Sequence, residues 1–175
     1  MMLRLRAAQE ADCDIILQLI TELAEYEQLR AEVVADRAAL QSALCAPSPR
    51  VFCTLAEWHN SPEDTATAGF ALWFYNFSTF KGRHGIYLED LFVRPEFRGR
   101  GIGRALLQSL AQRCMTEGLA RLEWAVLDWN RPALDFYAGL GAQALTQWVP
   151  HRVTGEALAQ LAAQATHASP SRPQS

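Results

Sequence analysis

Arginine and glycine alternate in the segment VRPEFRGRGIGRALL, residues 93–107, immediately before a predicted helix. The first turn of a helix has four unpaired backbone N–H groups, and the peptide dipoles place about half a positive charge there. Glycines let the backbone approach a ligand closely, and arginine side chains donate paired hydrogen bonds that suit phosphate oxygens. The residues concerned are Arg94, Arg98, Gly99, Arg100, Gly101, Gly103 and Arg104. The segment therefore predicts a site for a di- or oligophosphate that is bound mostly by main chain.

The spacing of the glycines decides between phosphate-binding motifs. A dinucleotide-binding loop requires G-x-G-x-x-G, but the last position is Arg104 when the count starts at Gly99 and Leu106 when it starts at Gly101. A nucleoside-triphosphate loop requires a lysine after its last glycine, and this region has none. The pattern that fits is R-x-x-G-x-G over residues 98–103.

Two adjacent carboxylates, Glu89 and Asp90, interrupt the apolar run IYLEDLFV, which otherwise has the composition of a strand at the centre of a sheet. A carboxylate on a buried strand can act as a general base. Such a base is needed wherever the attacking group is protonated at neutral pH, of which a primary amine with a pKa of about 10.4 is one example. Adjacent strand residues point to opposite faces, so the two carboxylates share one site only if a β-bulge intervenes.

The elements that must position these groups alternate along the chain, as expected for an α/β fold. Composition and alternation predict strands at residues 2–6, 50–58, 68–77, 86–93, 121–127 and 148–153. Helical periodicity predicts helices at residues 36–44, 102–118 and 155–163, and two more that start at Asp12 and Asn130, which are expected to cap them. We expect a single domain over residues 1–164, followed by a disordered polar tail at residues 165–175.

Composition excludes several classes of protein. The 175 residues are half hydrophobic, and a net charge of -3 is unlike the strongly basic surface of a nucleic-acid binder. The four cysteines form no CxxC pair and predict reduced core thiols rather than a metal site. The N-terminus lacks the apolar core of a secretory signal, and the longest uncharged run, residues 65–80, is too short and too polar to span a bilayer. A cytoplasmic protein with no membrane, nucleic-acid or metal partner is expected.

Five segments resemble one family in their order along the chain: ADCDIILQLITELAEYE, GFALWF, YLEDLFV, RGRGIG and WNRPALDFYAGLGA. On these segments the chain is identified as a member of the GNAT superfamily of N-acetyltransferases, similar to its spermidine/spermine and thialysine branch. The resemblance implies an α/β fold with a mixed, mostly antiparallel seven-stranded sheet, splayed between its fourth and fifth strands, with helices on both faces. It also implies acetyl-CoA as the acetyl donor, no metal, and a homodimer in which the last strand crosses between subunits.

The resemblance assigns roles to particular residues. Glu89 matches the base that deprotonates the amine, directly or through a water, and Tyr137 matches the acid that protonates the coenzyme A thiolate. A backbone N–H near Phe92 or Val93 is expected to polarise the thioester carbonyl. The residues expected to bind the cofactor are Leu91, Phe92, Val93, Arg98, Gly99, Arg100, Gly101, Ile102, Gly103, Asn130 and Tyr137. Those expected to bind the acceptor are Tyr26, Glu27, Glu89 and Asp90.

Acidic residues near the end of the first helix create a field that attracts a cationic amine. They are Glu22, Glu25, Glu27 and Glu32, although Glu22 and Glu25 fit a solvated helix face equally well. A small primary amine, acetylated by direct attack in a ternary complex, is the expected acceptor.

The third strand is followed by a departure from the spermidine/spermine pattern. Those enzymes carry Asp-Pro-Trp where this chain has Ser78, Thr79 and Phe80, so an acidic group that would hold a distal ammonium is missing. Thialysine, a related amino acid or a diamine is therefore at least as plausible an acceptor as a long polyamine. Two alternatives remain open: acetylation of a protein or peptide N-terminus, and a non-catalytic acyl-CoA-binding regulatory module.

Overall fold

The computed structural model describes residues 1–61 and 63–164. The predicted polar tail at residues 165–175 lies outside the described residues. The chain divides into two compact units, Met1–Leu127 and a second one that begins at Asp128. The sheet and the three longest helices of the first unit position the carboxylates Glu89 and Asp90 and the glycine loop, defined here as residues 98–103.

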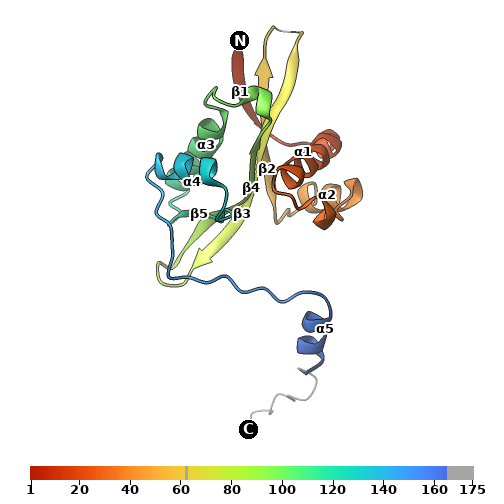
Figure 1. Ribbon diagram of the computed structural model, residues 1–175, viewed down its shortest axis with the longest axis vertical. Helices are drawn as coiled ribbons and strands as arrows, with labels where there is room; N and C mark the ends of the chain where they lie inside the picture. The colour runs from red at the N-terminus through yellow and green to blue at the C-terminus, as the bar shows by residue number, and fades with distance from the viewer. Residues whose placement is uncertain (62, 165–175) are drawn as a thin grey trace. The chain divides into compact units, whose positions relative to one another are not determined.

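A five-stranded sheet forms the centre of the first unit (Figure 1). Its strands lie side by side in chain order: β1 (Met2–Ala7), β2 (Phe52–His59), β3 (Thr65–Ser78), β4 (Arg83–Val93) and β5 (Leu122–Trp124). The first four strands pair antiparallel with their neighbours, whereas β5 pairs parallel with β4. The sheet is thus mixed and mostly antiparallel, as predicted.

The number of strands differs from the prediction, because the described residues form five strands in one sheet rather than seven. The strand predicted at residues 121–127 is confined to Leu122–Trp124. Trp124 pairs with Leu88, and a bulge in β4 directly after Leu88 prevents a regular ladder from continuing. Residues 148–153, also predicted as a strand, form neither helix nor strand. Pro150 in this segment has no N–H group for a ladder.

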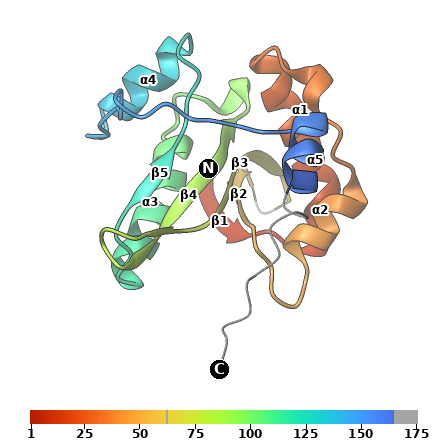
Figure 2. The ribbon, with the colours of Figure 1, turned by 90° about the horizontal axis from the view of Figure 1, so that it is seen from below.

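Helices cover both faces of the sheet, in the two views of Figures 1 and 2. On one face lie α1 (Cys13–Tyr26) and α2 (Arg37–Leu44), and on the other lies α3 (Ile102–Thr116). Single-turn helices η1 (Glu10–Asp12), η2 (Arg30–Glu32) and η3 (Pro95–Phe97) precede α1, connect α1 to α2 and follow β4. The arrangement confirms the prediction of helices on both faces.

Asp12 occupies the position before α1, but its side chain does not cap that helix, and the predicted capping hydrogen bond is wrong. The carboxylate instead accepts two hydrogen bonds from the Arg6 guanidinium of β1, at 2.6 and 2.8 Å. A guanidinium competes well for a carboxylate because both partners are charged and the contact is bidentate. The same contact lowers the pKa of Asp12. Asp12 thus ties the start of α1 to the edge strand.

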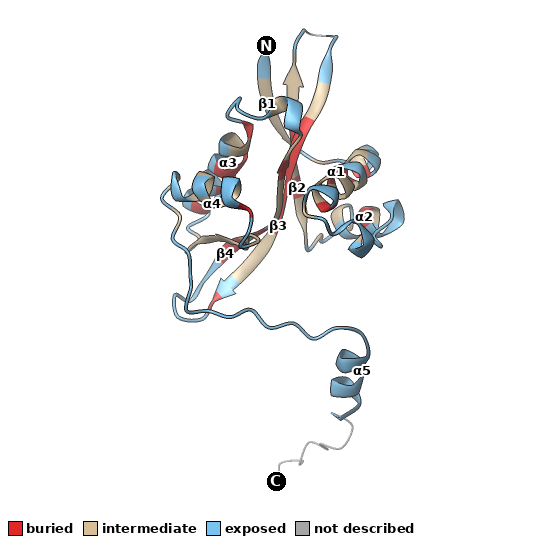
Figure 3. Cartoon of the chain, in the orientation of Figure 1, coloured by how far each residue is buried: buried red, intermediate tan, exposed pale blue. Residues whose placement is uncertain are grey.

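Figure 3 shows buried residues along the central strands of the sheet and on the helices α1 and α3. The cluster beneath α1 and α2 contains Cys13, Ile16, Leu19, Leu40, Cys53, Leu55, Phe70, Leu72 and Phe92. On the face covered by α3, the buried residues of the helix are Ile102, Leu106, Leu107, Leu110 and Cys114. The predicted core thiols Cys13, Cys53 and Cys114 are buried, whereas Cys45 is exposed.

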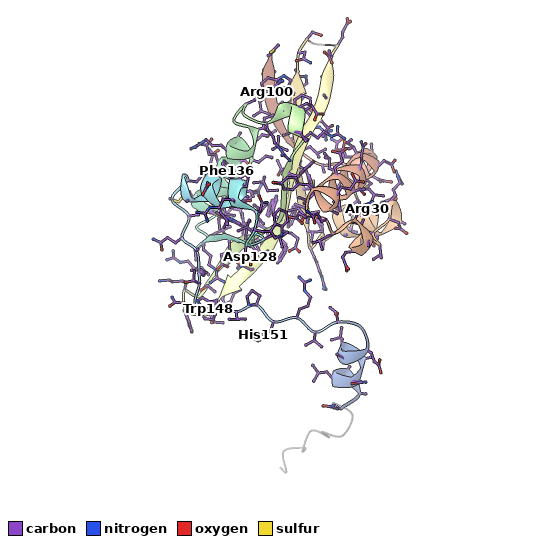
Figure 4. The ribbon with its side chains drawn as sticks, viewed as in Figure 1. Arg30, Arg100, Asp128, Phe136, Trp148 and His151 are labelled. Carbon is purple, nitrogen blue, oxygen red and sulfur yellow. The ribbon has the colours of Figure 1, made fainter. Side chains whose placement is uncertain are left out.

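The second unit contains α4 (Arg131–Ala138) and α5 (Gly155–Gln164). Trp148 and His151 lie on the segment that joins these two helices (Figure 4). Asn130 caps α4 as predicted, because its side-chain oxygen accepts a hydrogen bond from the N–H of Ala133 at 3.4 Å. The capping residue therefore sits where the sequence placed it.

Candidate active site

A bulge in β4 separates the two adjacent carboxylates. Along the β3–β4 ladder Leu72 pairs with Asp90 and Trp73 pairs with Leu88, so Glu89 is the extra residue. Bulges bend a strand and re-aim its side chains. The bulge that the two carboxylates need in order to share one site is therefore present, and it removes the strict alternation that would send Glu89 and Asp90 to opposite faces.

Asp90 lies on the α1 face of the sheet, because its partner Leu72 belongs to the core cluster beneath α1. Burial, followed by the charges of Glu89 and Glu27, raises the pKa of Asp90 to about 6. Burial also raises the pKa of Glu27, which follows α1 directly. The structure thus brings together three of the carboxylates that the sequence selected, one directly after α1 and two on β4. They form an acidic site, defined here as Glu27, Glu89 and Asp90.

The pairing of β4 and β5 ends where the bulge begins. The two strands pair at three positions, from Ile86 with Leu122 to Leu88 with Trp124. Beyond this point β4 continues to pair with β3, up to Val93 opposite Gly69. In the described part of the chain, no strand pairs with the other side of residues 89–93. The sheet is therefore open beside Leu91, Phe92 and Val93.

The glycine loop adopts the backbone that its sequence predicts. Gly99 and Gly101 have φ angles of 73° and 78°, in the left-handed region that favours glycine. A Cβ built at either position meets no atom within 4 Å, so the space around both glycines is open. Gly101 immediately precedes α3 and no side chain caps that helix within the described residues. The N–H groups of its first turn are thus available to an anion.

Two arginines of the glycine loop rest on aromatic rings. The Arg98 guanidinium lies 4.9 Å from the ring centre of Tyr26 and 5.8 Å from that of Phe92, and its Nε donates to the carbonyl of Val93 at 3.0 Å. Arg100, labelled at the loop in Figure 4, lies over the rings of Trp58 and Phe97 at 5.0 and 5.3 Å. Sequence reasoning did not select Trp58, because no local pattern connects β2 with a loop 40 residues later.

Arg94 binds Glu22 of α1 through two hydrogen bonds, at 2.8 and 2.7 Å. Its third contact is a hydrogen bond of 3.0 Å to the carbonyl of Thr67 on β3. The ion pair lowers the pKa of Glu22. Glu22 is therefore neither part of a solvated face nor free to attract an amine, and it fixes α1 against the end of β4.

A cavity of about 520 Å³ lies between the second half of α1 and the end of β4. Helix α1 contributes Gln18, Glu22, Glu25 and Tyr26, and the other wall consists of Phe92, Arg94, Pro95, Glu96 and Arg98. Tyr26 and Phe92 were both predicted to belong to the site. The cavity adjoins the acidic site, because Tyr26 precedes Glu27 and Phe92 follows Asp90 on the same strand.

The second unit holds two further predicted residues, Asn130 and Tyr137. Asn130 is 7% exposed and caps α4. Tyr137 is partly buried on α4, and its ring lies 5.3 Å from that of Phe136. Within the described residues, no group of histidine, cysteine or carboxylate side chains is arranged to hold a metal ion. None of the helices in the described ranges is long and apolar enough to cross a membrane.

Known proteins match the chain over most of its length. The sequence profile described as the Acetyltransferase (GNAT) family matches residues 15–142. A thialysine N-epsilon-acetyltransferase of Bos taurus is 42% identical over 164 residues, 90% of this chain and 96% of that protein. The L-ornithine N5-acetyltransferase NATA1 of Arabidopsis thaliana is 32% identical over 195 aligned residues, 89% of this chain and 86% of that protein. A solved integron cassette protein from the mobile metagenome of V. cholerae has a TM-score of 0.74 and 26% identity, over 93% of this chain and 98% of that one.

Proposed function

Because the chain belongs to the GNAT family of acetyltransferases, we propose that it transfers the acetyl group of acetyl-CoA to a primary amine of a small molecule, by direct attack in a ternary complex. The observation that carries the proposal is the course of the chain from the bulged carboxylates Glu89 and Asp90 along β4 and through the single turn η3 to the glycine loop. The carboxylates attract and deprotonate an amine, and the loop suits the phosphates of the cofactor.

Residues 98–103 would hold the pyrophosphate of acetyl-CoA, which supplies the acetyl group as a thioester. The left-handed glycines Gly99 and Gly101 leave open space beside the backbone, and Ile102 and Gly103 present N–H groups of the first turn of α3. Leu91, Phe92 and Val93 line the side of β4 that β5 leaves unpaired, and there we place the pantetheine arm. An N–H of Phe92 or Val93 would donate to the thioester carbonyl.

Glu89 is the proposed general base, directly or through a water, since it lies at the bulge beside the unpaired part of β4. Asp90 and Glu27 would hold the cationic amine before it loses its proton. Burial raises the pKa values of Asp90 and Glu27 because it disfavours their charged forms. A cation bound beside them would stabilise those charged forms. Asn130 is proposed to bind the cofactor arm, and the Tyr137 hydroxyl to give its proton to the departing thiolate.

Purified protein is expected to release free thiol from acetyl-CoA when it is given lysine, ornithine, thialysine or a small diamine. Tyr137→Phe removes one hydroxyl and should lower turnover by about 10²-fold with little change in cofactor affinity, the lower range for loss of a general acid. Thiol release and calorimetric titration with coenzyme A measure the two quantities. The matched control is Tyr75→Phe, since the Tyr75 hydroxyl donates a hydrogen bond to Glu117, the residue that follows α3. Unchanged turnover of Tyr137→Phe excludes this residue as the acid, and absence of transfer to any amine refutes the activity.

We also propose that the enzyme is a homodimer in which the segment between α4 and α5 meets a second copy of the chain. This segment exposes apolar side chains, with Leu145, Trp148 and Val149 at 56%, 69% and 72% exposure. Strand β5 is an edge of the five-stranded sheet, and an edge can accept a further strand. Strands contributed in this way would account for the difference between five and seven.

The dimer proposal predicts twice the monomer mass in solution by light scattering. The double variant Trp148→Asp/Val149→Asp is expected to be monomeric, because two carboxylates would replace the apolar contact surface. Met115→Asp is the matched control, since Met115 is 83% exposed on α3 and lies outside the proposed contact. A monomeric wild type at micromolar concentration contradicts the proposal.

We place the enzyme in the cytoplasm, which agrees with four cysteines that are all free thiols.

A further inference from the structure

We propose that the cavity between α1 and the end of β4 binds the α-ammonium and α-carboxylate groups of a free diamino acid, and that Arg98 selects the carboxylate. The inference rests on the proposed acetyl transfer and names its acceptor class. It differs from the expectation for the Arg98 side chain, whose charge the sequence assigned to phosphate. The backbone of residue 98 belongs to the loop, whereas the guanidinium lines the cavity.

The charges of the cavity leave Arg98 available for a ligand. Arg94 and Glu22 neutralise each other through their bidentate contact. Arg98 forms no ion pair with any residue in the described ranges, and its one hydrogen bond to a carbonyl uses Nε. The two terminal nitrogens therefore remain for a carboxylate, which a guanidinium can bind in bidentate fashion. The rings of Tyr26 and Phe92 hold the guanidinium plane in place.

The same cavity carries carboxylates that suit an α-ammonium group. Glu96 follows β4, and no ion pair engages it within the described residues. Glu25 makes a long contact of 3.8 Å with Arg30, and both side chains are more than half exposed. An ion pair of this kind contributes little and is easily exchanged. The cavity therefore presents one free cation and two carboxylates, the pattern complementary to an amino acid head group.

The distance to the acidic site fits the side chain of such an acceptor. Asp90 and Phe92 lie on one face of β4, two residues and thus about 7 Å apart along the strand. A head group beside Phe92 and Arg98 would place a terminal amine, four or five atoms away, beside Glu27, Glu89 and Asp90. A diamine of similar length has no carboxylate to neutralise Arg98, so its second ammonium would lie near an unpaired guanidinium, and like charges at short range repel. Two relatives are named for thialysine and L-ornithine, which are diamino acids.

The test compares acceptors that differ by one group. Lysine and cadaverine differ only in the carboxylate, and ornithine and putrescine form a second such pair. Wild-type kcat/KM is expected to favour each amino acid by about tenfold to hundredfold, the range for one charge-assisted contact. Arg98→Gln should bring the ratio close to one, while Arg98→Lys keeps part of the preference. Because both acceptors use the same cofactor, the ratio does not depend on any loss of cofactor affinity.

Matched variants distinguish an effect on the head-group contacts from an effect on the cofactor-binding loop. Arg104→Gln removes a loop arginine that does not line the cavity and should leave the lysine to cadaverine ratio unchanged. Glu96→Gln should lower the preference for lysine over aminocaproate, which lacks the α-amine. A wild type that prefers diamines, or an Arg98→Gln variant with an unchanged ratio, overturns the inference.

Binding without turnover gives an independent answer. Calorimetric titration with lysine and with cadaverine, in the presence of coenzyme A, measures the affinity of the cavity for each acceptor even when no acetyl group is transferred. Tighter binding of lysine that is lost in Arg98→Gln supports the inference, and equal affinities refute it. Transfer to diamines alone would leave the acetyltransferase activity intact and refute only the head-group site.

Discussion

Asp90→Asn is expected to stabilise the folded protein at neutral pH by up to about 3 kcal/mol while it weakens acceptor binding. Burial raises the pKa of Asp90 from 3.8 to about 6, and each pKa unit corresponds to about 1.4 kcal/mol. A carboxyl group whose folded pKa is raised favours the folded state below its unfolded pKa, and that contribution is lost as the pH rises through the folded pKa. The charged form of Asp90 therefore lowers the free energy of unfolding near pH 7. An uncharged asparagine of the same shape removes this destabilisation.

Urea unfolding of wild type and variant at about pH 4, close to the unfolded pKa, and at about pH 7, above the folded pKa, measures this difference. The variant should gain little at the lower pH and most at the higher one. Asp14→Asn is the control, because the Asp14 side chain is 72% exposed and its ion pair with Arg37 lies at the surface. A stability difference that does not change with pH would show that the Asp90 charge is well solvated in the fold. A destabilised active-site carboxylate is the usual exchange of stability for function.

The local parts of the site could be predicted from the sequence because they depend on neighbouring residues. Positive φ at Gly99 and Gly101, the cap at Asn130 and the extra residue at Glu89 are properties of short segments or of a family pattern. The start of α3 after the loop follows from the same local rules. These features are the ones that fix where a phosphate and an amine can bind.

The parts that sequence reasoning missed depend on residues far apart in the chain. Glu22 and Arg94 are separated by 72 residues, and only the packing of α1 against β4 shows that they neutralise each other. Asp12 follows the local rule for a cap, but Arg6 on the adjacent strand is the stronger partner. The seven-stranded sheet failed for a related reason, because a strand needs a neighbour, and residues 148–153 have none in the described part of the chain.

The largest effect on catalysis is expected for Glu89→Gln. Loss of a general base costs about 10²–10⁴-fold in turnover, and glutamine keeps the size of the side chain but cannot accept a proton from an ammonium group. The residual reaction must then use amine that is already neutral. The neutral fraction of the amine rises about tenfold per pH unit below a pKa of about 10.4. Residual kcat/KM should therefore climb steeply between about pH 7 and about pH 9, whereas the wild type levels off earlier.

Thiol release from acetyl-CoA across this pH range, with lysine as acceptor, distinguishes a base from a carboxylate that only binds the substrate. A substrate-binding carboxylate would raise KM and leave the shape of the pH profile unchanged. The control is Glu10→Gln, since Glu10 accepts a hydrogen bond from Gln41 at 2.6 Å near the opposite end of α1. A flat profile for Glu89→Gln would transfer the proton-accepting role to Asp90, the neighbouring carboxylate whose pKa of about 6 already lies near the working range of a base. A rising profile instead identifies the two carboxylates by different measurements. Glu89 changes the pH profile of catalysis, and Asp90 changes the pH profile of stability.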